Sequence, residues 1–157
     1  MELLGLPYRE TESIICRDED ETRKCALGFS LRLSPGSRMA LTGDLGAGKT
    51  AFVRGIAEAR GIKEGVHSPS YALVHTYPAA TLLHHADLYR LKETDDGETG
   101  WEELGLEELT EQGGILLIEW PERLPQGWRF DFWLHMTVGF EPTGMEYRLL
   151  RFFVATP

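Results

Sequence analysis

The stretch that decides the fold reads Gly43-Asp44-Leu45-Gly46-Ala47-Gly48-Lys49-Thr50 and matches the pattern G-x-x-x-x-G-K-[ST]. Glycines in such a loop let successive backbone N–H groups point at phosphate oxygens. The lysine adds a positive charge at the β- and γ-phosphates, and the threonine hydroxyl is a ligand for Mg²⁺. The sequence therefore predicts that a nucleotide phosphate is bound by Leu45, Gly46, Ala47, Gly48, Lys49 and Thr50.

The segments on either side of this loop agree with the prediction. Residues 39–42 form a short apolar run that is typical of a buried strand. After Lys49 the apolar residues Phe52, Val53, Ile56 and Ala57 recur on one helical face, and Gly61 stands where a C-terminal glycine cap belongs. A strand, a glycine loop and a helix in this order direct the helix dipole at a bound anion.

The rest of the chain alternates between strand and helix patterns. Strands are predicted at residues 13–16, 71–77, 81–86 and 115–118, and helices from about Asp18 to Arg32 and at 101–110. Residues 130–138 and 145–154 predict two strands joined by a turn at 139–144. The expected fold class is α/β, a P-loop NTPase-like mixed sheet flanked by helices with a C-terminal antiparallel strand pair.

Two acidic residues follow predicted strands. A P-loop enzyme needs a carboxylate at the tip of a neighbouring strand to hold the metal or orient the attacking water. Glu119 ends the run 115–118, and Asp87 ends the run 81–86. We assign Glu119 to Mg²⁺ together with Thr50, and Asp87 to the water, and the reverse assignment stays open. Lys49, Asp87 and Glu119 are thus the predicted catalytic residues.

Three further side chains near these strand ends need an interpretation. His84 and His85 are adjacent, so on a strand they point to opposite faces and cannot share a metal site. We interpret both as structural. Trp120 follows Glu119 directly, and its indole is predicted either to contact the nucleotide or to pack in the core.

The charge of the chain bears on its partners. The net charge is −9, and residues 92–111 hold nine acidic residues against one lysine. Nucleic-acid affinity comes largely from phosphates neutralised by a basic stripe, and this sequence has none. We therefore expect no direct sequence-specific nucleic-acid binding. The acidic segment is either a solvated helix face or loop, or a docking surface for a basic partner protein.

Length and composition limit the remaining classes. The 157 residues predict one domain spanning 1–157. No apolar run approaches the roughly 20 residues that cross a bilayer, and the N-terminus lacks the pattern of a secretory signal. We expect a cytoplasmic protein without a membrane span.

Of the two cysteines, Cys25 is expected to be buried, and a disulfide with Cys16 is not expected in a reducing compartment.

Two other nucleotide-binding classes fit the sequence less well. A small GTPase would carry an Asn-Lys-x-Asp clamp and an Asp-x-x-Gly switch, whereas this sequence contains no asparagine and no Asp-x-x-Gly. A small-molecule kinase usually carries an arginine-rich helical lid, and here the C-terminal third predicts strands. The kinase remains the alternative hypothesis, and a nucleotide-gated binding module is a third.

Several strings together resemble the TsaE (YjeE) family. They are the glycine loop, Ser68-Pro69-Ser70-Tyr71-Ala72-Leu73-Val74, His85-Ala86-Asp87-Leu88-Tyr89-Arg90-Leu91, Glu103-Leu104-Gly105 and Leu117-Ile118-Glu119-Trp120-Pro121. They occur in order between about residues 18 and 122. The loop alone is generic, and its combination with the Asp-Leu-Tyr-Arg-Leu and Ile-Glu-Trp-Pro strings is specific.

The resemblance implies an ATPase required to form threonylcarbamoyladenosine on tRNAs that read codons starting with A. In that family the transfer chemistry belongs to TsaD, which acts with TsaB, and the TsaE-like subunit binds ATP with Mg²⁺ and is a weak ATPase alone. Carried over to this chain, Thr22 would lie near the base. Ser70 would lie in a loop near the γ-phosphate, where the family usually has threonine, and Ala51 replaces a common second threonine.

Overall fold

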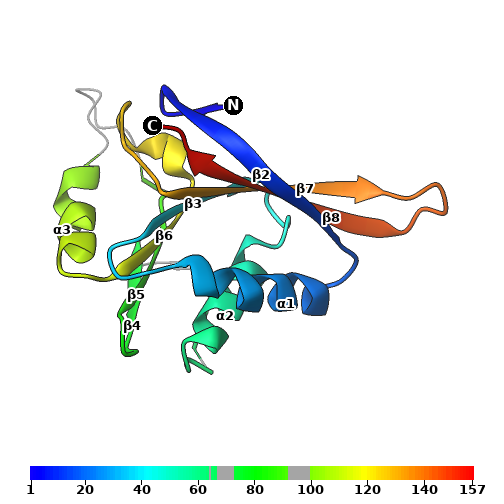
Figure 1. Ribbon diagram of the computed structural model, residues 1–157, viewed down its shortest axis with the longest axis horizontal. Helices are drawn as coiled ribbons and strands as arrows, with labels where there is room; N and C mark the ends of the chain where they lie inside the picture. Colours follow the sequence, from blue (N-terminus) through cyan, green and yellow to red (C-terminus); the bar gives the residue numbers. More distant parts are fainter. Residues whose placement is uncertain (64, 67–72, 92–99) are drawn as a thin grey trace.

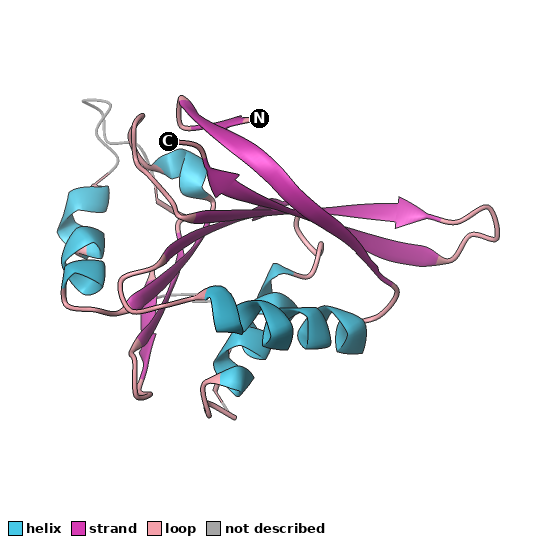
Figure 2. Ribbon diagram, viewed as in Figure 1, coloured by secondary structure: helices cyan, strands magenta, loops and turns pink. Residues whose placement is uncertain are grey.

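The computed structural model describes residues 1–63, 65–66, 73–91 and 100–157. These described residues form one mixed sheet of eight strands in the order β1-β2-β8-β7-β3-β6-β5-β4 (Figures 1 and 2). The strands are β1 (Glu2–Leu3), β2 (Leu6–Cys16), β3 (Arg38–Gly43), β4 (Val74–Tyr77), β5 (Leu83–Asp87), β6 (Ile115–Glu119), β7 (Phe132–Phe140) and β8 (Glu146–Ala155). The predicted α/β class and mixed strand direction are confirmed.

The parallel part of the sheet contains β3, β5, β6 and β7. β3 pairs with β6 on one side and with β7 on the other, and β5 pairs with β6. Every residue of β6 is buried, as expected for a continuous apolar run covered on both faces. Because these strands are parallel, their carboxyl ends lie at one edge of the sheet. Leu41, Asp87 and Glu119 stand side by side there in the register.

The antiparallel part contains β2, β7 and β8, and its hairpin β7–β8 was predicted within two residues at each strand end. The predicted strand at 13–16 was too short, and β1 was not predicted. β2 begins at Leu6 and pairs with β8 as far as Cys16, with a register irregularity between Glu10 and Glu12. The early part of β2 is mostly polar and exposed, so the apolar pattern that marks a strand is missing.

Helix α1 (Glu19–Phe29) lies with helix α2 (Lys49–Ala59) on one face of the sheet (Figure 1). Asp18 caps α1, since its Oδ1 accepts a hydrogen bond of 2.8 Å from the backbone N–H of Glu21. The predicted start is thus confirmed. The predicted end at Arg32 is three residues too far as an α-helix, because residues Ser30–Arg32 form a single 3-10 turn.

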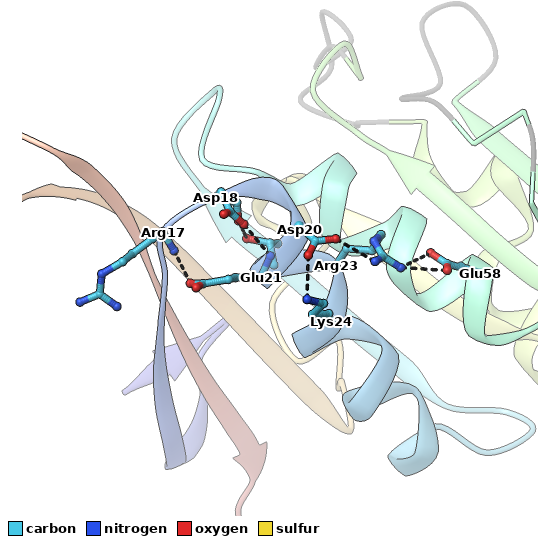
Figure 3. A network of polar contacts seen from close by, with 8 residues as sticks. Arg17, Asp18, Asp20, Glu21, Arg23, Lys24 and Glu58 are labelled. Carbon is cyan, nitrogen blue, oxygen red and sulfur yellow. Dashed lines mark hydrogen bonds and ion pairs between the residues drawn. The ribbon is translucent and has the colours of Figure 1, made fainter.

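The two helices approach each other closely. A Cβ atom on Gly55 would collide with Ala26 Cβ and with the carbonyl oxygen of Arg23, so glycine is needed at this crossing. On the exposed side, Arg23 bonds both carboxylate oxygens of Glu58, at 2.8 and 2.9 Å (Figure 3). Such exposed ion pairs contribute little to stability. The close approach at Gly55 therefore fixes how near α2 lies to α1.

The segment 101–110 was predicted as one helix and forms two elements. Residues Trp101–Leu104 make a 3-10 turn, and α3 (Leu106–Glu111) follows. Gly105 separates them with a φ of 62°, a left-handed conformation that stops a continuous helix. The glutamates of this segment are exposed. This agrees with a solvated helix face for 100–111, while residues 92–99 lie outside the described residues.

The core has two parts, one on each face of the sheet. Beneath α1 and α2, Phe29, Phe52 and Phe152 pack together. On the opposite face, Trp133 and Phe153 stack with ring centroids 4.6 Å apart. Both faces of the central strands are therefore buried.

Both cysteines are free thiols, as expected. The expected burial of Cys25 is only partly correct, since Cys16 is the buried one and Cys25 is partly exposed. Burial raises the pKa of the Cys25 thiol to about 12. Within the described ranges, no helix is long and apolar enough to span a bilayer.

A candidate nucleotide-binding site

The glycine loop connects β3 to the N-terminus of α2. Gly43 has a φ of 137°, and a Cβ there would collide with the backbone carbonyl of Met136 on β7. Gly48 occupies the N-cap position of α2 with a φ of 102°. Both conformations are readily adopted only by glycine. The glycines in the motif therefore follow from backbone geometry that the loop requires.

Lys49 is the first residue of α2 and is almost fully buried, with 7% of its surface exposed. Its Nζ donates to the carbonyl oxygens of Gly43, at 2.5 Å, and Asp44, at 3.1 Å. Unpaired N–H groups and the helix dipole make the N-terminus of α2 attractive to an anion. The ammonium group is thus held within the loop at the place where such an anion would bind.

A cavity of about 470 Å³ lies against this loop. It is lined by Glu19, Leu45, Gly46, Gly48, Lys49, Thr50, Ala51, Arg54, Asp87, Glu119 and Trp120. The volume is within the roughly 300–1,000 Å³ of small-molecule sites. Segments from α1, the loop, α2, β5 and β6 thus meet around one cavity.

The two predicted acids lie on neighbouring strands at the edge of this cavity. Asp87 and Glu119 are direct partners in the β5–β6 register. Asp87 Oδ1 accepts a hydrogen bond of 3.0 Å from the backbone N–H of Tyr89. Glu119 is only 3% exposed, and its Oε2 lies 3.1 Å from Nε2 of His85. Glu119 also neighbours Leu41 of β3, the strand that leads into the loop.

Trp120 has a positive φ of 59°, which is uncommon for a residue other than glycine. This backbone turn after Glu119 brings the indole over Lys49, with Nζ 5.3 Å from the ring centroid. The ring also packs against Tyr89, with centroids 4.9 Å apart. Trp120 thus packs against the core and also lines the cavity, and its contact with a nucleotide stays a prediction.

The oxygen donors at this edge fit Mg²⁺ chemically. Thr50, Asp87 and Glu119 all line the cavity, and Mg²⁺ prefers hydroxyl and carboxylate oxygens. Among the residues that the structure describes, no group of three or more His, Cys, Asp or Glu side chains could hold a metal ion. Mg²⁺ is usually bound by one or two protein ligands completed by phosphates and water.

Two of the predicted binding residues, Ala47 and Thr22, are not among the described residues that line the cavity. Ala47 is fully buried beneath the loop. Thr22 is buried in α1, where its Oγ1 lies 3.4 Å from the carbonyl of Asp18, and Glu19 of the same helix lines the cavity instead. Ser70 lies outside the described residues. Contact of these residues with a nucleotide stays a prediction.

Glu19, Ala51, Arg54 and His85 were not among the predicted site residues. Ala51 and Arg54 follow the motif on α2, so the helical period could have indicated them. No local pattern indicates Glu19 or the contact of His85 with Glu119. Those two depend on the packing of α1 and on the β5–β6 register.

A glycine loop between a buried strand and a helix, facing carboxylates on neighbouring strands, defines a P-loop nucleotide-binding protein. The family model for threonylcarbamoyl adenosine biosynthesis protein TsaE matches residues 16–144. The chain therefore belongs to the TsaE family.

Individual relatives agree with this assignment. The tRNA threonylcarbamoyladenosine biosynthesis protein TsaE of Bacillus subtilis is 38% identical over 112 residues, covering 68% of this chain and 67% of the relative. The protein of the same name from Treponema pallidum is 34% identical over 110 residues, covering 70% and 78%. The crystal structure of Bacillus subtilis YdiB superposes with a TM-score of 0.68 at 26% identity, covering 96% of this chain and 88% of that one.

Proposed function

We propose that this chain is the ATP-binding and ATP-hydrolysing subunit that supports threonylcarbamoyladenosine formation on tRNAs that read codons starting with A. It acts in the cytoplasm with TsaB and TsaD, and TsaD carries out the transfer chemistry. The observation that carries this proposal is the glycine loop facing Asp87 and Glu119 across one cavity, in a chain of the TsaE family.

In this proposal the loop residues hold the phosphates, and Lys49 neutralises charge on the β- and γ-phosphates. Thr50 and Glu119 would hold Mg²⁺, which would supply neutralisation of phosphate charge when bound. Asp87 orients or deprotonates the attacking water. Glu119 is assigned to the metal because it stands next to β3, which leads into the loop, whereas Asp87 is one strand farther away.

The charge of the chain supports contact with tRNA through partners. The net charge of −9 and the exposed glutamates at 102, 103, 107, 108 and 111 repel a phosphate backbone. A subunit that drives a complex without reading the tRNA needs no basic surface. The alternative of a small-molecule kinase is not supported by any of the relatives described above, which are named as tRNA modification proteins.

The proposal is tested by combining the purified chain with TsaB and TsaD from the same cell. We expect phosphate release from ATP that rises when both partners are present, together with repeated rounds of tRNA modification. Omission of the chain is expected to stop modification after at most one round. Transfer of labelled γ-phosphate to a metabolite in cell extract would instead support the kinase.

The roles of the two acids are separated by isosteric amides. Glu119→Gln is expected to weaken Mg²⁺-dependent nucleotide binding. Asp87→Asn is expected to leave that binding intact and to lower turnover by on the order of 100-fold or more, as loss of a general base does. The opposite pattern, with Mg²⁺ dependence lost in Asp87→Asn alone, would reverse the assignment.

A further inference from the structure

Glu119 contacts the side chain of His85, a residue to which the proposed chemistry gives no role. The imidazole of His85 is fully buried, and its Nε2 lies 3.1 Å from Oε2 of Glu119. A carboxylate buried to this extent requires a hydrogen-bond partner. Within the described ranges, the side-chain partner found for Glu119 is His85.

The position of His85 on β5 explains why it meets Glu119 while its neighbour His84 does not. Successive strand residues point to opposite faces, so His85 and Asp87 share a face. Asp87 pairs with Glu119 in the register, and His85 stands two residues earlier on the same strand. His84 points to the other face, where its Nδ1 lies 2.8 Å from Thr76 Oγ1.

The direction of the hydrogen bond follows from the groups involved. An ionised carboxylate can only accept, so Nε2 of His85 carries the proton and donates it. No partner for Nδ1 of His85 exists among the residues that the structure describes.

We propose that His85 is a positioning residue that holds Glu119 in the orientation needed for Mg²⁺. The inference rests on the proposed function and extends it. His85 contacts Oε2, and Glu119 lines the cavity, so Oε1 is the carboxylate oxygen that His85 leaves available to Mg²⁺. Mg²⁺ demands near-ideal octahedral geometry, so a freely rotating carboxylate would bind it less well. Groups that orient metal ligands commonly affect metal affinity by 10- to 100-fold.

The test measures Mg²⁺ dependence of binding and needs no turnover. Binding of a non-hydrolysable ATP analogue to the full chain is followed by calorimetry, in EDTA and across a Mg²⁺ titration. His85→Leu is expected to raise the half-saturating Mg²⁺ concentration by roughly 10-fold or more and to leave affinity in EDTA unchanged. His85→Gln is expected to stay near the wild-type value, because its amide nitrogen reaches about as far as Nε2 and also donates.

His84→Leu is the matched control, since it removes an imidazole from the adjacent position without touching Glu119. We expect no change in its Mg²⁺ dependence. If His85→Leu does not fold, the comparison passes to His85→Gln against His85→Asn, whose shorter amide cannot reach Oε2. An unaltered Mg²⁺ dependence in folded His85→Leu or His85→Asn would overturn the inference. So would a loss of Mg²⁺ affinity in His85→Gln as large as in His85→Leu.

The same titrations separate this inference from the proposed function. Absence of any analogue binding by the wild-type chain would overturn the proposed function and the inference together. Binding by the wild type with the same Mg²⁺ dependence in every His85 variant would overturn the inference alone.

Discussion

The parallel and antiparallel parts of the sheet differ in how their strands are buried and in what their ends carry. β3 and β6 are covered on both faces and end at the glycine loop and at Glu119. β2 and β8 mix buried with exposed residues, and the hairpin β7–β8 extends well beyond the rest of the sheet (Figure 1). The candidate site is therefore built almost entirely on the parallel part.

The difference indicates that the parallel part carries the candidate site and the antiparallel part supports the core, and substitutions can test this. Parallel strands bring their carboxyl ends to one edge, so chemistry collects there. The antiparallel strands supply apolar surface on which α1 packs, through Phe152 and its contacts with Phe29 and Phe52. Changes in the antiparallel part should lower stability with little effect on nucleotide affinity. Changes at the parallel edge should do the reverse.

The largest expected effect is a loss of folding stability, from Phe152→Ala in the antiparallel part. Phe152 is 2% exposed and stacks on Phe29 with centroids 4.9 Å apart. Truncation should lower the free energy of unfolding by about 3–5 kcal/mol, measured by urea denaturation. Phe140→Ala on β7 is the control, because Phe140 is 67% exposed and should change stability by less than about 0.5 kcal/mol. Equal losses in the two variants would contradict the proposed role of this core.

The next largest expected effect is a loss of ATP turnover, from Lys49→Ala at the parallel edge. Loss of the ammonium group should reduce ATP turnover in the assembled complex by on the order of 100-fold or more, with the thermal unfolding midpoint close to that of the wild type. Lys63→Ala removes an exposed lysine outside the cavity and should leave turnover unchanged. Sustained rounds of tRNA modification by Lys49→Ala would rule out its assigned role.

A smaller effect is expected on the pH dependence of stability. It comes from His84, which lies on β5 but faces away from the site. Burial lowers its pKa below the ordinary value of 6.5. The unfolded chain therefore binds a proton at a pH where the folded chain does not, and stability falls as pH drops below about 6.5. The slope from this residue is at most about 1.4 kcal/mol per pH unit. In His84→Gln the fall between pH 6.5 and 5 should become shallower, as followed by urea denaturation at each pH. An identical slope in both proteins would contradict this.

The smallest effect is expected at Asp20, in the network at the start of α1 (Figure 3). Hydrogen bonds from Lys24 and Arg23 lower the Asp20 pKa to about 2, from 3.8. Its stabilising contribution is present above about pH 3.8 and is lost as pH falls through 2. Because the side chain is exposed, Asp20→Asn should lower the unfolding midpoint only slightly at pH 7, and less in high salt. A difference that persists at pH 2 would show that the ion pairs are not its cause.

Much of the parallel part could be predicted from the sequence, because its signals are local. The run 115–118 is continuously apolar and is confirmed as part of β6, and the turn into Lys49 is marked by its glycines. Strand β2, which forms the outer border of the sheet beyond its two-residue pairing with β1, was harder to predict, since Arg9, Glu10 and Glu12 interrupt its apolar pattern. Charged residues on edge strands discourage pairing with other molecules and also hide the strand in the sequence.

Within the candidate site, the sequence did not predict contacts that depend on the pairing of distant strands. Asp87 and Glu119 could be proposed because each directly follows an apolar run. His85 was interpreted as structural, and its bond to Glu119 depends on the register between β5 and β6, which no local pattern specifies. The contact of Thr22 with the base, which the resemblance implies, stays a prediction. Glu19 of the same helix lines the cavity, and no local pattern indicates it.

The sequence by itself determined the strand, the glycine loop and the helix around Lys49, because their geometry depends on residues within a dozen positions of one another. It also determined membership of the TsaE family through the order of its strings. The sequence proposed that Lys49, Asp87 and Glu119 share a site, but only the tertiary structure placed them around one cavity and brought His85 against Glu119. The physical reason is strand order, since β5 and β6 take their places beside β3 through pairing between segments that are distant in the chain.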